Sequence, residues 1–260
     1  MEKTSSSWNK FWSKVNWHRT NTTALLFAAA IIIAALALGH AFMKRNQTQG
    51  VISVTGLGKK DFTSDMVVWE GSFSKTDMAM KTAAAALNKD RQMIEDYLLK
   101  NGINANEMLF SAVNISQRTQ THYSQDGRVI GETFAGYQLS QSVQISSKDI
   151  EKVDAVSRNI TQLISDGVML ASGAPRYYYS KLSDLKLELI SEATQDARAR
   201  VEKIAEKSGG KIGNLVNAQM GVFQITGKNS DEEYSEGGTF NTSSKEKSAT
   251  ITMRLTYRIR

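Results

Sequence analysis

The sequence predicts an α+β protein in which about three helices pack on a mainly antiparallel sheet, preceded by one N-terminal transmembrane helix. Three observations predict this class. A long apolar run lies near the N-terminus, several segments alternate apolar and polar residues with the period of a strand, and three segments repeat apolar residues at helical spacing. The helical segments are residues 75–101, 150–163 and 182–207.

The composition narrows the possible functions. The chain has 260 residues, of which 41% are hydrophobic, and no cysteine. This length suits one domain or two small ones. The lack of cysteine excludes disulfides, thiol catalysis and cysteine-based zinc sites. Only one of three histidines, His122, lies clearly outside the N-terminal region, which leaves little for a histidine metal site or a catalytic triad. We therefore expect no catalytic residue, no metal and no cofactor.

Most of the net positive charge lies in the N-terminal region. The formal net charge is +6, from 32 basic and 26 acidic residues. Six of the basic and one of the acidic residues lie in residues 1–45, which leaves 26 and 25 for the rest. A nucleic-acid surface usually needs a charged patch on the folded domain, so the composition favours no nucleic-acid partner.

The apolar run Ala24–Met43 has the length of a membrane span. It contains one ionisable residue, His40, and as a helix it would extend roughly 30 Å, the thickness of a bilayer core. We assign residues 23–43 to a transmembrane anchor, 1–22 to a cytoplasmic and interfacial segment, 44–50 to a linker and 51–260 to the folded domain. Apolar residues at helical spacing from Trp8 to Val15 predict a short helix at the membrane interface.

A cleaved signal peptide is the alternative to an anchor. Ala35–Ala37 and Gly39–Ala41 both resemble small-residue cleavage sites. The segment before the apolar run is long and rich in aromatic residues, and the run itself is long. Both features favour an uncleaved anchor. Lys44 and Arg45 follow the run and weaken the charge argument for orientation, so the cytoplasmic N-terminus and the cleavage state stay predictions.

The stretch GLGKKD at residues 56–61 has the glycines and lysines of a phosphate-binding loop. Such a loop must lead into the N-terminus of a helix, whereas residues 62–73 alternate like a strand. We therefore predict that Gly56 and Gly58 form a turn between two strands, where they tolerate positive φ or a close backbone contact.

The remaining elements follow in order. A helix over 75–101 ends at Gly102, and a strand covers 109–115. Asp126-Gly127 marks a hairpin before the strand 137–145, and Ser146 with Asp149 fits a capping box for the helix 150–163. The segment 168–179 reads as a strand in which Pro175 indicates an edge or a bulge. After the helix 182–207 come a strand over 214–226, a polar loop over 227–247 that we expect to be mobile, and a half-buried strand over 249–260.

Two pairs of residues are candidates for a partner-binding site or interface. Tyr177 and Tyr179 would share one face of a strand, where they stack on a ligand, join a subunit interface or fill the core. Arg254 and Arg258 lie on the polar face of the last strand, where they either meet a partner or form a solvated face.

Residues 50–260 resemble the SIMPL domain family. The resemblance rests on the opening strand with Ile52, Val54, Gly56 and Gly58, on the segment from Tyr137 to Val153, and on the alanine-periodic stretch EATQDARARVEKIAEKSGGKIGNLV at residues 192–216. The chain departs from the family pattern at Ser64-Asp65, where Pro-Asp is usual.

The resemblance implies a bacterial envelope protein. Members are periplasmic, are linked to stress tolerance and surface antigens, and include a ring-like homo-oligomer; no catalytic residue carries over. We therefore expect a non-enzymatic, self-assembling protein that is linked to envelope or oxidative stress tolerance, with a single pass through the bacterial inner membrane and a periplasmic C-terminal domain. The alternative is an extracytoplasmic binding module for a partner protein or a small ligand. The oligomer number and the ligand are left open.

Overall fold

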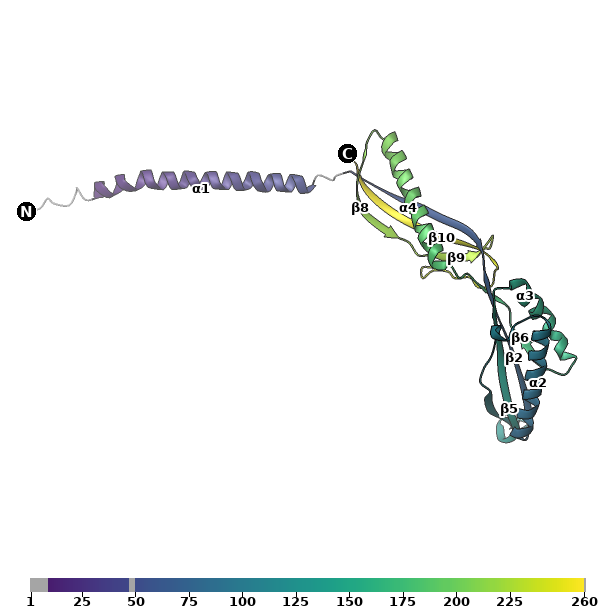
Figure 1. Ribbon diagram of the computed structural model, residues 1–260. Helices are drawn as coiled ribbons and strands as arrows, with labels where there is room; N and C mark the ends of the chain where they lie inside the picture. The colour runs from purple at the N-terminus through teal and green to yellow at the C-terminus, as the bar shows by residue number, and fades with distance from the viewer. Residues whose placement is uncertain (1–8, 47–49, 260) are drawn as a thin grey trace, which may run out of the picture.

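The computed structural model describes residues 9–46 and 50–259. It begins with one continuous helix, α1 (Asn9–Asn46), followed by two lobes arranged end to end (Figure 1). The apolar window Ala24–Met43 lies within α1, and no other described part of the chain covers it. The interfacial helix predicted from Trp8 is continuous with the predicted span from Asn9 onward, and Trp8 itself lies outside the described residues.

The lobe that follows α1, here called the proximal lobe, contains a four-stranded antiparallel sheet and one helix. Its strands are β1 (Val51–Thr63), β8 (Ile212–Met220), β9 (Gln224–Gly227) and β10 (Glu246–Ile259). The order is β1-β10-β8, and β9 also pairs with β10, so the last strand of the chain is the central one. The helix α4 (Leu182–Lys207) packs across β1 and β10 on one face.

The second, distal lobe contains a six-stranded antiparallel sheet. Its strands are β2 (Met66–Asp77), β3 (Met108–Phe110), β4 (Asn114–Tyr123), β5 (Val129–Ser147), β6 (Leu170–Ser172) and β7 (Arg176–Tyr178). β5 pairs with β2 on one side and with β3 and β4 on the other, while β6 and β7 pair with the far side of β2. The helices α2 (Met80–Lys100) and α3 (Ile150–Asn159) cover one face, together with the 3-10 turns Ala105–Glu107 and Ile160–Ile164.

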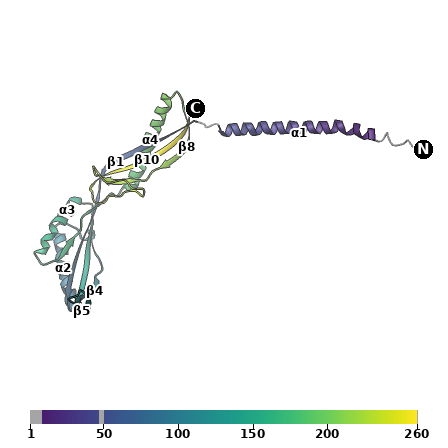
Figure 2. The same cartoon turned by 180° about the vertical axis from the view of Figure 1, so that it is seen from behind.

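Each lobe has its own apolar core. The distal core is the larger one and surrounds Trp69, which is fully buried and donates its indole N–H to the Ser172 hydroxyl at 3.1 Å. The proximal core is formed by α4 residues such as Leu189 and Ala193 packed on Ile225 and Ile251. Figure 2 shows the same two-lobed outline from behind. The α+β class, the antiparallel pairing and the helices are thus confirmed, but the sheet is divided in two.

The division occurs at Ser64 and Asp65, between β1 and β2. The backbone N–H of Ser64 bonds to the Lys245 carbonyl beside the proximal sheet, and that of Asp65 bonds to the Tyr178 carbonyl in the distal sheet, both at 3.0 Å. Consecutive residues therefore join different sheets, so β1 and β2 do not form a hairpin with each other.

Several element boundaries differ from those predicted. α2 begins at Met80 because Lys75–Asp77 continue β2 and pair with Tyr137–Leu139 of β5. The predicted strand over 109–115 is split between β3 and β4. Asp149 caps α3, because its side chain accepts a hydrogen bond from the Lys152 backbone N–H. The Asp149 backbone N–H itself bonds to the Ser147 hydroxyl, so the predicted capping box with Ser146 is wrong.

Other predictions are confirmed. α4 spans Leu182–Lys207 as predicted, and Gly127 ends the β4–β5 turn with a φ of 74°. Pro175 lies between β6 and β7, the two short pieces that line the outer side of β2, as expected for an edge that is interrupted by proline.

Candidate functional site

Gly56 and Gly58 lie inside β1, so the predicted turn is wrong, while the predicted close backbone contact is confirmed. A Cβ atom on Gly56 would lie 2.2 Å from the Ala193 carbonyl oxygen of α4, and one on Gly58 would lie 2.3 Å from that of Leu189. The glycines and Ala197, which is buried, let the helix backbone approach the strand directly. This arrangement explains the small residues on both elements without a ligand.

α4 also bonds to β1 through two of its carboxylates. The backbone N–H of Leu57 donates to the Asp196 carboxylate at 2.9 Å, and Lys60 forms an ion pair with Glu188 at 2.5 Å. Occupied edge groups of this kind prevent another strand from adding to a sheet. The carboxylates on this part of α4 therefore engage the protein's own strand and its neighbouring basic residues.

Asp65 and Ser180 hold the two lobes together where the chain crosses between them. The carboxylate of Asp65 accepts hydrogen bonds from the Ser180 backbone N–H at 2.7 Å and from its hydroxyl at 2.6 Å. Burial opposes ionisation of Asp65, but these hydrogen bonds outweigh it and lower the pKa of the carboxyl group. The joint thus contains a bidentate acceptor that stays ionised at neutral pH.

The polar loop between β9 and β10 contributes further contacts to the joint. The Tyr177 backbone N–H donates to the Thr242 carbonyl at 2.7 Å, and Lys245 forms an ion pair with Glu151 of α3. These bonds connect the loop of the proximal lobe to a strand and a helix of the distal lobe.

The tyrosines predicted to bind a partner lie at this joint. Tyr177 packs on the distal core, and its hydroxyl donates to the Asp154 carboxylate at 2.9 Å. Burial, with this acceptor, raises the pKa of Tyr177 to about 12. Tyr179 packs on the proximal core, with its ring centroid 4.8 Å from that of Phe62. The two side chains therefore pack on different cores instead of forming one stacking surface.

Arg254 and Arg258 are exposed on β10. Arg254 is the cross-strand partner of Thr55, and Arg258 that of Val51, where β1 begins. Alternate residues of β10, such as Ile251 and Leu255, are buried on the face that α4 covers, so the arginines occupy the open face of the sheet. They lie at the end of the proximal lobe that is joined to α1.

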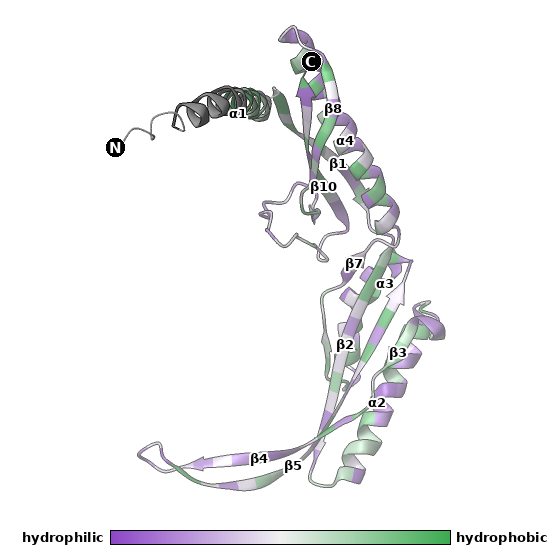
Figure 3. Ribbon diagram, turned by 90° about the vertical axis from the view of Figure 1, so that its left-hand side faces the viewer, coloured by the Kyte–Doolittle hydropathy of each residue, from purple (hydrophilic) through white to green (hydrophobic). Residues whose placement is uncertain are grey.

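The β4–β5 hairpin forms an arm that extends away from the distal lobe (Figure 3). Where the arm joins the lobe, Ile115 is 51% exposed although its cross-strand partner Leu139 is only 2% exposed. Further out, the cross-strand partners Tyr123 and Val129 are 63% and 61% exposed, and Phe134 packs its ring edge on Tyr137. The arm thus presents large apolar side chains that nothing in the described part of the chain covers.

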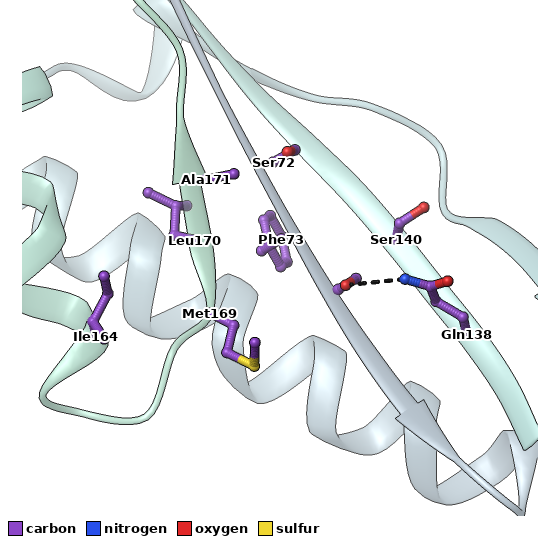
Figure 4. Close-up of a pocket in the computed structure, with 9 residues that line it drawn as sticks. Ser72, Phe73, Gln138, Ser140, Ile164, Met169, Leu170 and Ala171 are labelled. Carbon is purple, nitrogen blue, oxygen red and sulfur yellow. Dashed lines mark hydrogen bonds between the residues drawn. The ribbon is translucent and has the colours of Figure 1, made fainter.

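A hollow of about 560 Å³ lies where β6 begins beside β2 (Figure 4). Ser72, Ser74, Gln138 and Ser140 line it from the open face of the distal sheet, with the Gln138 amide 3.4 Å from the Ser74 hydroxyl. Ile164, Met169 and Leu170 line it on the other side. The hollow therefore combines neutral hydrogen-bonding groups with an apolar wall and carries no charged lining residue.

A buried lysine organises the loop that we expected to be mobile. Lys247, only 2% exposed, donates to the backbone and side-chain oxygens of Asn241 at 2.7 and 3.2 Å. Glu232 accepts from the Asn241 amide at 2.5 Å and from the Gly227 backbone N–H at 2.7 Å. Burial lowers the pKa of Lys247 to about 8, against the attraction of Glu232. The loop is thus held by an internal polar network.

A further titratable pair is buried in the distal lobe. Lys75 of β2 forms an ion pair with the buried Asp90 of α2 at 3.0 Å and donates to the Gly167 carbonyl at 3.2 Å. Within residues 9–46 and 50–259, no three histidine or acidic side chains gather in a way that would hold a metal ion. These groups contribute to structure, which leaves exposed features such as the arm and the hollow for recognition.

Sequence reasoning missed the arm and the joint for different reasons. Asp126-Gly127 located the hairpin turn, but the polar alternation of β4 gave no sign that the hairpin would leave the sheet. Asp65 drew attention only through the pair Ser64-Asp65, which stands where the family usually has Pro-Asp. Its role depends on Ser180, which is 115 residues away along the chain.

The comparisons with known proteins identify a family but no characterised relative. A family model named SIMPL, described as a protein of unknown function (DUF541), matches residues 52–258. The match begins inside β1, ends inside β10 and so includes both lobes. No characterised protein matched the chain significantly.

Proposed function

Because the chain belongs to the SIMPL family, whose function is not known, we propose its role from the geometry: it is a non-enzymatic, membrane-anchored envelope protein that self-assembles. The β4–β5 arm is the observation on which this proposal rests. A two-stranded hairpin is only marginally stable in water by itself. Exposed apolar residues on such a hairpin are typical of a surface that another molecule covers.

A second copy of the chain is the proposed partner of the arm. The outer edge of β4 pairs with no other strand among the described residues, whereas on β1 the Leu57 backbone N–H is already bonded to Asp196 of α4. Identical arms that pair around a twofold axis would cover the same apolar residues on both copies. The last strand, which is central in its sheet, is not the assembling edge.

The bonding of the titratable groups supports the non-enzymatic part of the proposal. The groups with clear structural partners, such as Asp65, Tyr177, Glu232 and Lys247, bond to neighbouring elements of the protein. None of these four lines the hollow of Figure 4.

The proposed location is supported by α1. Its Ala24–Met43 window is long and apolar enough to cross a membrane, and a signal sequence would pass the same test. We propose that the helix is retained as a single span of the bacterial inner membrane, with both lobes in the periplasm. The N-terminal sequence of the protein purified from membranes tests this, because a start after residue 35 would show cleavage.

The test of self-assembly is the mass of the full chain in detergent, by size exclusion with light scattering. The variant Tyr123→Lys with Val129→Glu replaces two exposed apolar partners by an opposite-charge pair, which preserves the hairpin. We expect a lower mass for this variant than for the wild type. The matched control, Leu187→Lys with Leu99→Glu, changes two exposed leucines of α4 and α2 and should leave the mass unchanged.

The hollow beside β6 supports a second candidate, a binding module for a small, neutral ligand with an apolar part. Ala171 lines the hollow, so Ala171→Trp should fill it. A compound that raises the melting temperature of the wild type but not of Ala171→Trp would support this function. Replacing Tyr177 or Tyr179 would test it poorly, because both side chains pack on the cores.

A further inference from the structure

The end of the proximal lobe nearest α1 carries an excess of positive charge. It comprises the second half of α4, the turn after it, β8, and the adjoining ends of β1 and β10. Its charged residues are Asp196, Arg198, Arg200, Glu202, Lys203, Glu206, Lys207, Lys211, Arg254 and Arg258. Seven are basic and three acidic, whereas residues 51–259 as a whole hold 25 of each sign. The folded part is neutral overall but polarised, with its positive end toward α1.

The three acidic residues at this end are already paired. Glu202 pairs with Arg198, Asp196 with Arg200, and Glu206 with Lys203, all at 2.9 to 3.1 Å. Within the described residues, Lys211, Arg254 and Arg258 have no carboxylate partner, and all three are exposed. Their charge is therefore available to a ligand outside the chain.

The chain itself keeps this end close to the membrane. Four residues separate Asn46, at the end of α1, from Val51, and such a segment extends at most about 18 Å. Arg258 is the cross-strand partner of Val51, and the Ile259 backbone N–H bonds to the Gly50 carbonyl at 2.8 Å. This tether is short enough for Arg258 to reach the headgroup layer, which is about 5–8 Å thick, whatever angle α1 adopts.

Exposed apolar residues accompany the basic ones. Val51, Ile204, Leu215 and Val216 are all about half exposed at this end. β8 contains no charged residue from Ile212 to Met220, and α4 leaves it largely uncovered. Apolar side chains among unpaired basic ones are the composition of surfaces that lie at a membrane interface.

We propose that this end of the proximal lobe binds the anionic phospholipid headgroups of the same bilayer that holds α1, through Arg254, Arg258 and Lys211. The inference rests on the anchoring proposed above. Binding here fixes the height and tilt of the proximal lobe on the membrane. The distal lobe and its arm then project away from the surface at a defined angle, which aligns the arms of neighbouring copies.

The test uses the full chain in lipid nanodiscs. Because the protein has no cysteine, Gln219→Cys, the exposed cross-strand neighbour of Arg254, accepts a single fluorophore. Discs contain either phosphatidylcholine alone or phosphatidylcholine with phosphatidylglycerol, and both carry a headgroup-bound quencher. We expect stronger quenching in the anionic discs and a decrease when the salt concentration is raised, because counterions screen the attraction.

The variant Arg254→Glu with Arg258→Glu should reduce quenching in anionic discs to the level found with phosphatidylcholine alone. Its matched control is Lys81→Glu with Lys89→Glu, which makes the same charge change on exposed lysines of α2 and should not alter quenching. Circular dichroism melting of both variants verifies folding. A separate label at Asn88→Cys in the distal lobe should remain unquenched in all discs.

The outcomes separate the two proposals. If the chain is recovered with the discs but quenching is the same in both lipids, or persists in Arg254→Glu with Arg258→Glu, headgroup binding is overturned and the anchoring stands. If the chain is not recovered with the discs, the anchoring fails, and headgroup binding fails with it.

Discussion

The carboxylate of Asp65 accepts two hydrogen bonds from Ser180, one from its backbone N–H at 2.7 Å and one from its hydroxyl at 2.6 Å. Asp65 opens the distal lobe, and Ser180 follows its last strand on the return to α4. The pair therefore joins the outgoing and returning crossings between the lobes. An assembly that projects its arms from the distal lobes requires this joint to keep a defined angle.

Asp65→Ala should destabilise the protein by about 1–3 kcal/mol, because it leaves the Ser180 donors without their acceptor. Urea unfolding measures this loss, and Thr63→Ala, which removes a hydroxyl that bonds to exposed Glu246, is the control. The pKa of Asp65 is lowered in the folded state, so its contribution is present above about pH 3.9 and is lost as the pH falls through the folded-state pKa. Equal stability of Asp65→Ala and wild type at pH 7 would refute the role of the joint.

Gly56→Ala should destabilise the proximal lobe by about 3 kcal/mol, because the new methyl group would meet helix backbone that cannot rotate away. The added Cβ would lie 2.2 Å from the Ala193 carbonyl oxygen and 2.4 Å from the Ala197 nitrogen. Gly237→Ala, where no atom lies within 4 Å of the new Cβ, should change stability by less than about 0.5 kcal/mol. Thermal melting of both variants measures these changes in stability. A melting temperature of Gly56→Ala equal to that of the wild type would disprove the close contact.

Lys247 should give the protein a stability that rises with pH in the alkaline range. Burial lowers its folded-state pKa to about 8, whereas the unfolded-state value is near 10.5. The cost of burying the charged amine is fully present below about pH 8 and is relieved as the pH rises toward 10.5, by up to about 3 kcal/mol. Lys247→Met should lack this rise when urea unfolding is compared at pH 7.5 and 10. Parallel pH profiles for the two proteins would contradict the assignment.

Lys75→Met should lower the free energy of unfolding more than most single substitutions in the distal lobe. It would leave the carboxylate of Asp90, which is 4% exposed, without the ammonium group 3.0 Å away. Removing one partner of a buried ion pair typically costs about 3–5 kcal/mol. The double variant Lys75→Met with Asp90→Leu should recover much of that loss in urea unfolding. A double variant less stable than Lys75→Met would show that the pair is not the cause.

Local signals in the sequence predicted local structure well. The alanine-rich period of α4 predicted both of its ends, and Asp126-Gly127 predicted the hairpin turn. Pro175 predicted the interrupted edge beside β2. In each case, one property of the chain, its apolar spacing or its turn chemistry, determines the conformation within a few residues.

Long-range pairings were not predictable in the same way. The sequence predicted Gly56 to be a turn residue, because a glycine in a strand and one in a turn look alike in sequence. Only the packing of α4 against β1 distinguishes the two. The polar loop reads as mobile because its composition does not reveal that Lys247 will be buried against Asn241. The arm and the hollow both depend on where β4 and β6 end relative to β5 and β2, which apolar spacing does not specify.

The mass of the full-length protein in detergent tests the account most directly. Size exclusion with light scattering at two or more protein concentrations, corrected for bound detergent, gives the number of 28.7 kDa chains in each particle. We predict a discrete assembly of two or more chains that Tyr123→Lys with Val129→Glu dissociates. A wild-type protein that remains a single 28.7 kDa chain at every concentration would contradict self-assembly through the arm.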